Sequence, residues 1–146
     1  MKIKIAWIGK TKEPAIQALT DEYLKRLGRY AEVEGLTLKD EAALLKMCSA
    51  EARPRHALVL LDSRGKALSS EEFAKWIGDF IDRNPLTLLF AVGPANGFSE
   101  EARRSAGLQL SLGKMTLAHE LARVVLLEQV YRAFTILKNH PYHLGH

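Results

Sequence analysis

The sequence predicts an α/β protein whose mainly parallel sheet is flanked by helices. Short apolar runs of strand length alternate along the chain with segments whose apolar residues recur at helical spacing, and this alternation is typical of parallel sheets covered on both faces. The 146 residues, 47% hydrophobic and 26% charged, match the size of one domain with a buried core. No repeat, low-complexity run or linker interrupts them. We therefore expect a single domain over residues 1–146.

Two strands and two helices are predicted in the first third of the chain. Residues 2–9 and 33–38 are predicted strands. Between them, Pro14 suits the first turn of a helix, and the apolar residues that follow recur at helical spacing: Ile16, Leu19, Tyr23 and Leu27. Asp40 can cap a short helix that runs to about Ala52, because its side chain can accept hydrogen bonds from unpaired backbone N–H groups.

The middle of the chain is predicted to form a buried strand followed by a capped helix. Residues 56–61 form a continuous apolar run, which is typical of a central strand buried on both faces. Residues 63–66 are predicted to be a turn. Ser69 and Glu72 stand at capping-box spacing, and the helix after them carries an apolar inner stripe: Phe73, Ile77, Phe80 and Ile81. The Asn-Pro pair at 84–85 ends this helix.

The last third begins with another apolar strand at residues 86–92, followed by a turn-rich segment at 93–97. Ser99 can cap a further helix, and residues 108–112 form the last predicted strand. A long helix is expected at residues 117–138, and it is apolar around too much of its circumference for one exposed face. Such a helix needs covering from two sides, which predicts a homodimer contact.

Composition narrows the class of protein. The net charge of +4 permits a polyanionic partner without requiring one. The first apolar stretch is too short, and is interrupted by Lys4, for a signal peptide, and no segment approaches the ~20 apolar residues of a membrane span. The single cysteine, Cys48, has no partner for a disulfide or a metal site. We expect a soluble, cytoplasmic protein with no metal and no membrane partner.

Ligands of open α/β sheets collect outside the carboxyl ends of the strands. The candidate ligand loops are therefore residues 62–66, 93–98 and 112–116. Glycine in such loops permits close approach of the backbone to a ligand. Neither a GxGxxG fingerprint nor a P-loop specifies a dinucleotide or a nucleoside triphosphate. The pattern thus indicates where a ligand binds without identifying it.

Histidines crowd the end of the chain, at His140, His143 and His146. They could be metal ligands, a functional tail or an ordinary terminus. Metal is disfavoured because no cysteine or carboxylate stands nearby. Pro141 stiffens the segment and Tyr142 supplies a ring suited to stacking on a base, which favours a functional tail. Within the long helix, Glu128 and Arg132 stand at the spacing of an ion pair.

Three segments carry a resemblance to a known family. They are LSLGKMTLAHELARV at 110–124, EQVYRA at 128–133 and NHPYH at 139–143. Together they closely resemble the ribosomal large-subunit pseudouridine methyltransferase H (RlmH) family of the SPOUT class. The likeness spans essentially the whole chain and is densest after Leu86. It implies a homodimer of α/β subunits whose carboxyl-terminal part is threaded into a deep trefoil knot, an exception to the rule against knotted chains.

The resemblance also implies a cofactor, S-adenosylmethionine, bent across the knot. By position, its contacts carry over to residues in the three candidate loops: Leu61, Gly93, Leu112, Gly113, Lys114, Met115, Thr116 and Leu117. Backbone groups would then supply much of the adenine recognition, which explains why no charged signature is visible.

The implied substrate is a pseudouridine of large-subunit ribosomal RNA within the ribosome, methylated on the ring nitrogen between the two carbonyls. On this resemblance, His143 is the first candidate to accept the proton or orient the base, and Tyr142 the candidate for stacking or hydrogen bonding. Arg123 and Arg132 are candidates for RNA or dimer contacts. The tail of one subunit is expected to complete the site of the other.

The chain departs from the family pattern at three positions. Pro94 stands where a second glycine is common, Ala118 where proline is common, and Leu144 where a basic residue is common. Pro94 removes a backbone donor and Leu144 removes a phosphate contact. Two other functions remain open: a knotted dimer that binds RNA or a nucleotide without catalysis, and a methyltransferase for another RNA, such as transfer RNA. The sequence also leaves open whether the free large subunit or the complete ribosome is the substrate.

Overall fold

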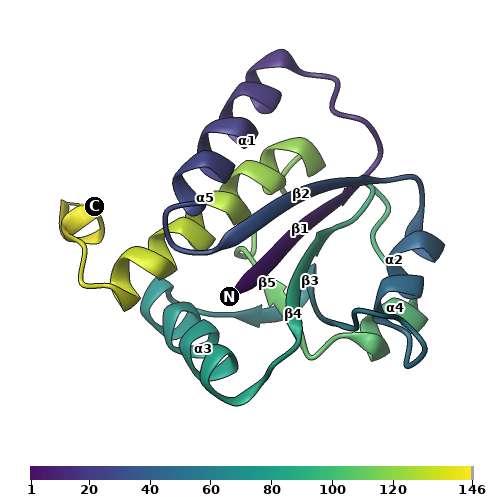
Figure 1. The fold of residues 1–146 in the computed structure, drawn as a ribbon. Helices are drawn as coiled ribbons and strands as arrows, with labels where there is room; N and C mark the ends of the chain where they lie inside the picture. The colour runs from purple at the N-terminus through teal and green to yellow at the C-terminus, as the bar shows by residue number, and fades with distance from the viewer. Residues whose placement is uncertain (146) are drawn as a thin grey trace.

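A five-stranded sheet, parallel throughout, forms the centre of the molecule (Figure 1). The computed structural model describes residues 1–145, with the exception of the His143 side chain. Strand order in the sheet is β2-β1-β4-β3-β5, so the chain begins near one edge and ends its last strand at the other. The predicted parallel sheet with flanking helices is confirmed.

The helices and strands alternate along the chain as the sequence predicts. In order they are β1 (Lys2–Ile8), α1 (Pro14–Leu27), β2 (Glu32–Leu38), α2 (Glu41–Cys48), β3 (His56–Ala67), α3 (Ser70–Arg83), β4 (Thr87–Val92), α4 (Glu100–Ser105), β5 (Leu108–Ser111), α5 (His119–Leu137) and a final 3₁₀ turn, η1 (Pro141–Gly145). Within the described residues, no helix is long and apolar enough to cross a membrane.

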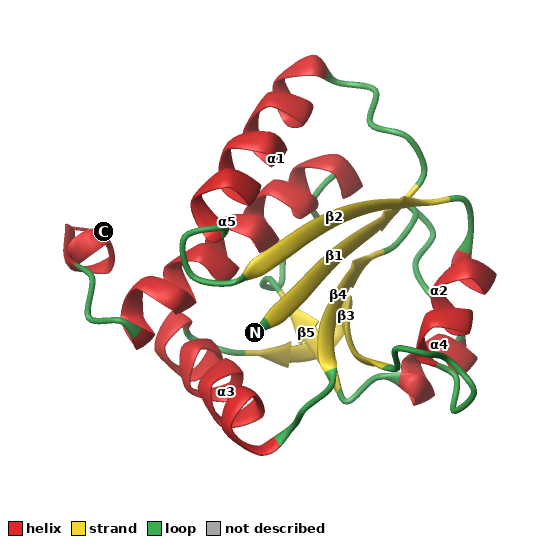
Figure 2. Cartoon of the chain, in the orientation of Figure 1, coloured by secondary structure: helices red, strands yellow, loops and turns green. Residues whose placement is uncertain are grey.

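Helices cover both faces of the sheet (Figure 2). Helices α1, α3 and α5 lie on one face, and the shorter α2 and α4 lie on the other. Alternate residues of each strand point to opposite faces, so the core divides into two clusters. In β1, Ile3 and Ile5 belong to the larger cluster under α1, α3 and α5, whereas Ala6 packs with Leu44 of α2 and Ala102 of α4.

Local capping signals are confirmed in atomic detail. The Ser69 hydroxyl accepts from the Glu72 N–H at 3.0 Å, and the Glu72 carboxylate accepts from the Ser69 N–H at 2.8 Å, which is the reciprocal capping box. Asp40 accepts from the Ala43 N–H at 3.0 Å. Its helix is shorter than predicted and ends at Cys48 rather than near Ala52, because Ser49 turns to an extended conformation.

The predicted turn at residues 63–66 is wrong, because this segment belongs to β3. Leu110 of β5 aligns with both Leu61 and Lys66, so the intervening residues bulge out and the strand then returns to β5. A Cβ on Gly65 would lie 2.4 Å from the backbone oxygen of Gln109, which only glycine permits. The sequence did not predict this extension of β3, because its residues are polar and typical of turns. The extension forms only because it pairs with β5.

The long helix α5 is covered mainly by its own subunit. It packs on the sheet and is flanked by α1 and α3, which bury Leu126, Leu127 and Val130. Leu121 remains 46% exposed. Most of the apolar surface of α5 is thus buried within one chain. Burial of α5 therefore does not require the expected dimer contact.

Candidate functional site

A cleft of about 530 Å³ opens beside the bulge in β3 and at the carboxyl ends of β4 and β5. Its lining comes from this bulge, from the loops after β4 and β5 and from the neighbouring helices: 61–64, 92–98, 111–113, 115–119, Arg103 and Ala122. Parallel strands run in one direction, and for that reason the bulge and the two loops, which are far apart in sequence, meet at one edge of the sheet.

Most residues expected to contact the cofactor line this cleft: Leu61, Gly93, Leu112, Gly113, Met115, Thr116 and Leu117. Lys114 is not part of the lining. Met115 is 87% exposed, although it borders the cleft. The fold therefore brings the candidates together with one exception, and their contacts with a cofactor stay a prediction.

Two glycines shape the cleft for different reasons. A Cβ on Gly93 would lie 2.8 Å from Cε2 of Phe98, whose buried ring packs against this backbone. Gly113 has φ of +135°, a conformation that other residues rarely adopt, and a Cβ there would meet no atom within 4 Å. The Ser111 hydroxyl holds this turn by accepting from the Gly113 N–H at 3.1 Å and donating to its carbonyl at 2.9 Å.

Pro94 lines the cleft directly after Gly93. Its carbonyl accepts from the Gly97 N–H at 2.9 Å, and Gly97 adopts φ of +82°, so residues 94–97 form a closed turn. Proline has no N–H, so this position offers a ligand only its carbonyl and ring. Ala118, the second departure from the family pattern, also borders the cleft, whereas Leu144 lies in η1 and is 76% exposed.

An ion pair forms one rim of the cleft. The Arg103 Nε donates to the Asp62 carboxylate at 2.7 Å, and the backbone N–H of Arg64 donates to the other oxygen at 2.9 Å. Burial would raise the pKa of Asp62, but these donors outweigh it and hold the pKa below its ordinary value. Sequence reasoning missed this pair, because no local pattern relates Asp62 to a residue 41 positions away.

The amino-terminal end of α5 ties a distant loop to the cleft. His119 lines the cleft, and the next residue, Glu120, accepts hydrogen bonds from the N–H groups of Lys12 and Glu13 at 3.0 and 3.2 Å. Burial opposes ionisation of Glu120, but the two donors keep its pKa below the ordinary value. The carboxylate thereby fixes the loop between β1 and α1 against the entrance of α5.

Arg123 is buried, with 1% of its surface exposed. Its guanidinium lies over the Trp7 ring, 4.4 Å from the centroid, and donates to the Thr11 hydroxyl. Burial lowers the pKa of Arg123, and Glu120 opposes this only in part. Its buried Nε has no hydrogen-bond partner among the described residues. The burial of Arg123 argues against the expected contact with RNA.

The end of the chain is anchored on the middle of α5. The Tyr142 hydroxyl donates to the Glu128 carboxylate at 2.7 Å, and the Tyr23 hydroxyl donates to the same oxygen at 3.1 Å. The predicted pair between Glu128 and Arg132 is confirmed, with an N–O distance of 2.6 Å, and the Arg132 guanidinium lies 5.2 Å from the centre of the Tyr142 ring. Burial and Glu128 raise the pKa of Tyr142 above its ordinary value.

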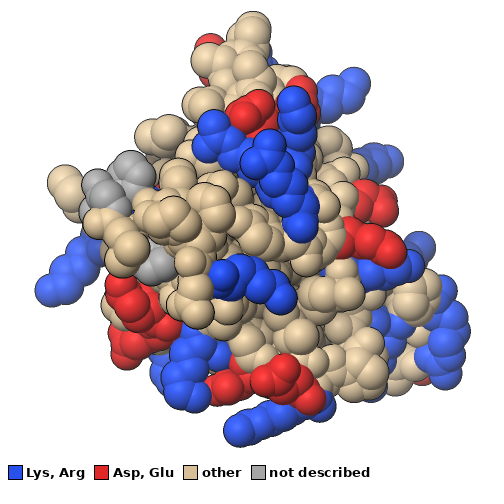
Figure 3. All heavy atoms as spheres, turned by 60° about the vertical axis from the view of Figure 1, so that its left-hand side comes forward, with Lys and Arg blue, Asp and Glu red and all other residues tan. Residues whose placement is uncertain are grey.

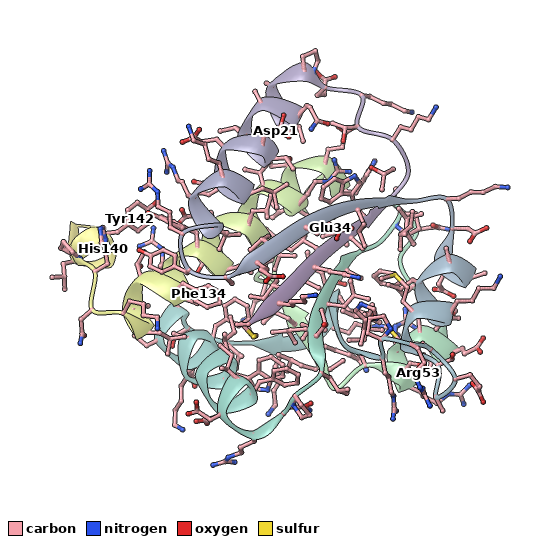
Figure 4. All side chains as sticks on the ribbon, viewed as in Figure 1. Asp21, Glu34, Arg53, Phe134, His140 and Tyr142 are labelled. Carbon is pink, nitrogen blue, oxygen red and sulfur yellow. The ribbon has the colours of Figure 1, made fainter. Side chains whose placement is uncertain are left out.

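The tail and the cleft lie at different positions along α5. His119 borders the cleft at the beginning of the helix, whereas the ring of Tyr142 packs edge-on against Tyr131, with centroids 4.9 Å apart. Twelve helical residues separate positions 119 and 131, which is about 18 Å along the axis. Figure 4 shows Tyr142 and His140 beyond the other end of α5. The side chain of His143 lies outside the described residues.

No group of three or more histidine, cysteine, aspartate or glutamate side chains gathers as a metal site in the part of the chain that the structure describes. The available chemistry is that of a ligand cleft with apolar walls, glycine backbone and one ion-paired rim. Such a cleft suits an organic cofactor of moderate size.

Comparison with known proteins matches residues 1–143 to the family model described as "Predicted SPOUT methyltransferase". A protein of Koribacter versatilis named "Ribosomal RNA large subunit methyltransferase H" is 56% identical over 146 residues, all of both chains. A protein of the same name from Geobacter sulfurreducens is 45% identical and covers 98% of this chain and 99% of its own.

A solved structure described as a probable methylase family protein from Haemophilus influenzae Rd KW20 is similar in fold, with a TM-score of 0.61 at 11% identity. It covers 96% of this chain and 69% of the solved chain. The family match over nearly all residues, the full-length relatives and the five-stranded parallel sheet agree. The chain belongs to the SPOUT methyltransferase family.

Proposed function

We propose that this chain uses S-adenosylmethionine to methylate N3 of a pseudouridine in large-subunit ribosomal RNA, on the assembled ribosome in the cytoplasm. The observation that carries the proposal is the cleft: the bulge of β3 and the loops after β4 and β5 converge there in a chain whose full-length relatives are named ribosomal RNA large subunit methyltransferase H. Figure 3 adds that Lys and Arg side chains gather, with acidic groups among them, on the face beside the carboxyl-terminal end. A ribosomal substrate presents many phosphates to such a face.

The residues of the cleft fit an adenosyl cofactor. The volume of the cleft, about 530 Å³, lies within the range of small-molecule sites. Leu61, Leu112 and Leu117 supply apolar walls for a purine ring. Gly113 leaves open space where the backbone can approach the ligand closely. When bound, S-adenosylmethionine supplies an activated methyl group on a positively charged sulfur. The Asp62 carboxylate, already held by Arg103, provides a fixed negative charge on the same rim.

The protein's own task is to align the target base and remove its N3 proton. We assign proton acceptance or orientation of the base to His143, which directly follows the anchored Tyr142. Because the Tyr142 hydroxyl donates to Glu128 and the Tyr142 ring packs edge-on against Tyr131, we assign Tyr142 the role of holding the tail. Arg132 lies beside the Tyr142 ring and stays a candidate for an RNA phosphate.

We infer a homodimer, and the separation of cleft and tail supports it. The tail packs about 18 Å along α5 from the lip of its own cleft, so a tail from a second subunit would have to complete the site. The trefoil knot is supported by the match of residues 1–143 to the SPOUT methyltransferase family.

The test is transfer of labelled methyl from S-adenosylmethionine to ribosomes from cells that lack this gene, with the modified nucleoside mapped by mass spectrometry. We expect label on a single pseudouridine of the large subunit. Separated large subunits and complete ribosomes are assayed in parallel to identify the true substrate. Label on transfer RNA instead would reassign the substrate, and cofactor binding without transfer to any RNA would favour a binding protein.

A further inference from the structure

A second hollow, of about 450 Å³, lies at the β5 edge of the sheet. Its walls come from the far end of β3, from α3, and from the residues that lead into β5: Arg64, Gly65, Lys66, Leu68, Trp76 and 106–109. None of these residues is among those expected to hold the cofactor. The hollow therefore has no role in the proposed reaction as described so far.

The charged side chains that line this hollow are cations, although Asp62 lies beside Arg64 and Lys66 is close enough to Glu72 to help lower the pKa of that carboxyl. Arg64 and Lys66 line the hollow, and no carboxylate is among its described lining residues. The Arg64 side chain is 63% exposed and its Nε lies 3.7 Å from Asp62, a distance that leaves the guanidinium free to bind another anion as well. Lys66 is exposed and forms no salt bridge within residues 1–145. An anionic ligand matches this site.

An aromatic ring, that of Trp76, lines the hollow together with these cations. Trp76 is partly buried on α3 and stacks on Phe80, with centroids 5.6 Å apart and an interplanar angle of 20°. Its remaining exposed surface lines the hollow. Aromatic rings beside cations are the combination that proteins use for single-stranded nucleic acid, because bases stack on the ring while the cations bind phosphates.

Arg64 lines both this hollow and the cofactor cleft. Its backbone N–H donates to Asp62, a rim residue of the cleft, at 2.9 Å, so the position of Arg64 is fixed relative to the cleft. A target nucleotide must leave its stack to reach a methyl donor, and its neighbours in the strand then lie just outside the cleft. We propose that the hollow binds the single-stranded RNA next to the target nucleotide, with phosphates on Arg64 and Lys66 and a base on Trp76.

A peptide strand added to the edge of β5 fits less well. The backbone of Gln109 and Leu110 is already approached by Gly65, whose Cβ would lie 2.4 Å from Gln109 oxygen and 2.8 Å from Leu110 nitrogen if it were present. The strand has only the four residues Leu108–Ser111. Strand addition needs a longer run of open backbone groups.

The identity of the target nucleotide rests on the proposed function, whereas the binding of RNA by the hollow does not.

The test compares Arg64→Gln/Lys66→Gln with a control that loses the same charge elsewhere, Lys2→Gln/Lys46→Gln. Binding of a fluorescently labelled single-stranded RNA is measured by anisotropy as salt is varied, and KM and kcat are measured with ribosomes. We expect RNA affinity about tenfold weaker at low salt and a salt slope shallower by roughly 1.4, since each phosphate contact with a single strand contributes about 0.7. The KM for ribosomes should rise similarly. Affinity for S-adenosylmethionine is measured with Lys66→Gln alone and should be unchanged, because Lys66 lines only the hollow whereas Arg64 also lines the cofactor cleft.

Trp76 is tested by Trp76→Leu and Trp76→Tyr, both checked for an unchanged melting temperature. The Trp76→Tyr variant should keep most of the RNA affinity and the Trp76→Leu variant should lose it, because only an aromatic ring stacks on a base. RNA affinity and salt slope equal to those of the lysine control would overturn the proposal. RNA binding that depends on the hollow without methyl transfer by the unmodified protein would refute the proposed function and leave the hollow as an RNA site.

Discussion

The Tyr142 hydroxyl donates to the Glu128 carboxylate at 2.7 Å and joins the last turn of the chain to the middle of α5. Tyr23 of α1 donates to the same carboxylate oxygen at 3.1 Å, and Arg132 binds the other at 2.6 Å. One carboxylate thus connects α1, α5 and the tail. In the proposed reaction this cluster fixes the backbone from which His143 extends.

Removing the Tyr142 hydroxyl should impair turnover more than folding. Tyr142→Phe keeps the ring on Tyr131 but loses the bond to Glu128, which is worth about 1 to 3 kcal/mol of tail anchoring. We expect kcat to fall roughly tenfold or more, because misplacing a catalytic group is costly, while affinity for S-adenosylmethionine stays the same. Single-turnover methyl transfer and calorimetric titration of the cofactor measure the two effects.

Tyr30→Phe is the matched control for that experiment. Tyr30 stacks on Phe134 in the same aromatic cluster, and its hydroxyl forms no hydrogen bond within the described residues. The Tyr30→Phe variant should therefore keep the kcat of the unmodified protein. Equal activity of Tyr142→Phe and Tyr30→Phe would remove the anchoring role from Tyr142.

Gly65→Ala should destabilise the protein. Its Cβ would lie 2.4 Å from the Gln109 oxygen, and the backbone there cannot yield as a flexible side chain would. Overpacking of this kind costs about 1 to 3 kcal/mol, or a melting temperature lower by roughly 3 to 10 °C for a chain of this size. Gly107→Ala is the control, because its nearest contact would be an ordinary 3.8 Å. Thermal unfolding followed by circular dichroism should distinguish the two variants. Equal melting temperatures would contradict the close approach of β3 to β5.

Gly93→Ala should weaken cofactor binding through Phe98. The added Cβ would lie 2.8 Å from the Phe98 ring, so either the ring or the loop at the cleft must move. We expect the Kd for S-adenosylmethionine to rise about tenfold, by analogy with other sub-ångström disruptions of a preformed site. The second change Phe98→Leu should restore part of the affinity, because it removes the clashing ring edge. Unchanged Kd in Gly93→Ala would show that this loop does not shape the cofactor site.

His56 should make stability depend on pH. It is 5% exposed, its Nδ1 lies 3.1 Å from the Met47 carbonyl, and its Nε2 has no partner in the described part of the chain. Burial lowers the pKa of His56 below its ordinary 6.5, aided by Lys4 and opposed by the Met47 carbonyl and Glu34. The unfolded chain therefore binds the proton first as the pH falls, so this contribution to stability is complete above pH 6.5 and is lost below it.

The variant His56→Gln keeps a side chain that can donate to the Met47 carbonyl but does not titrate. Its free energy of unfolding should vary less between about pH 7.5 and 5.5 than that of the unmodified protein, by at most about 1.4 kcal/mol per pH unit for one proton. Urea unfolding across this range measures the difference. Parallel profiles for both proteins would mean that another group controls the acid sensitivity.

Elements and caps were predictable because they depend on residues close in sequence. The capping box of Ser69 and Glu72 and the pair of Glu128 with Arg132 each join residues within one helical turn. The loops after β4 and β5 were also predictable, since any parallel sheet gathers its carboxyl-terminal loops at one edge, whereas the third predicted loop, 62–66, is a bulged part of β3. The residues proposed to hold the cofactor came from the family resemblance, and the geometry of the fold alone would not have selected them.

The sequence by itself determined the α/β class, the succession of strands and helices and the edge of the sheet where the cleft opens, because periodicity and local caps express these features. Only the tertiary structure decided the strand order β2-β1-β4-β3-β5, the extension of β3 past Gly65, the burial of Arg123 against Trp7 and the anchoring of Tyr142 on Glu128. Each of these depends on partners that chain folding brings together from distant positions. Their energies arise from contacts and desolvation that no local pattern encodes.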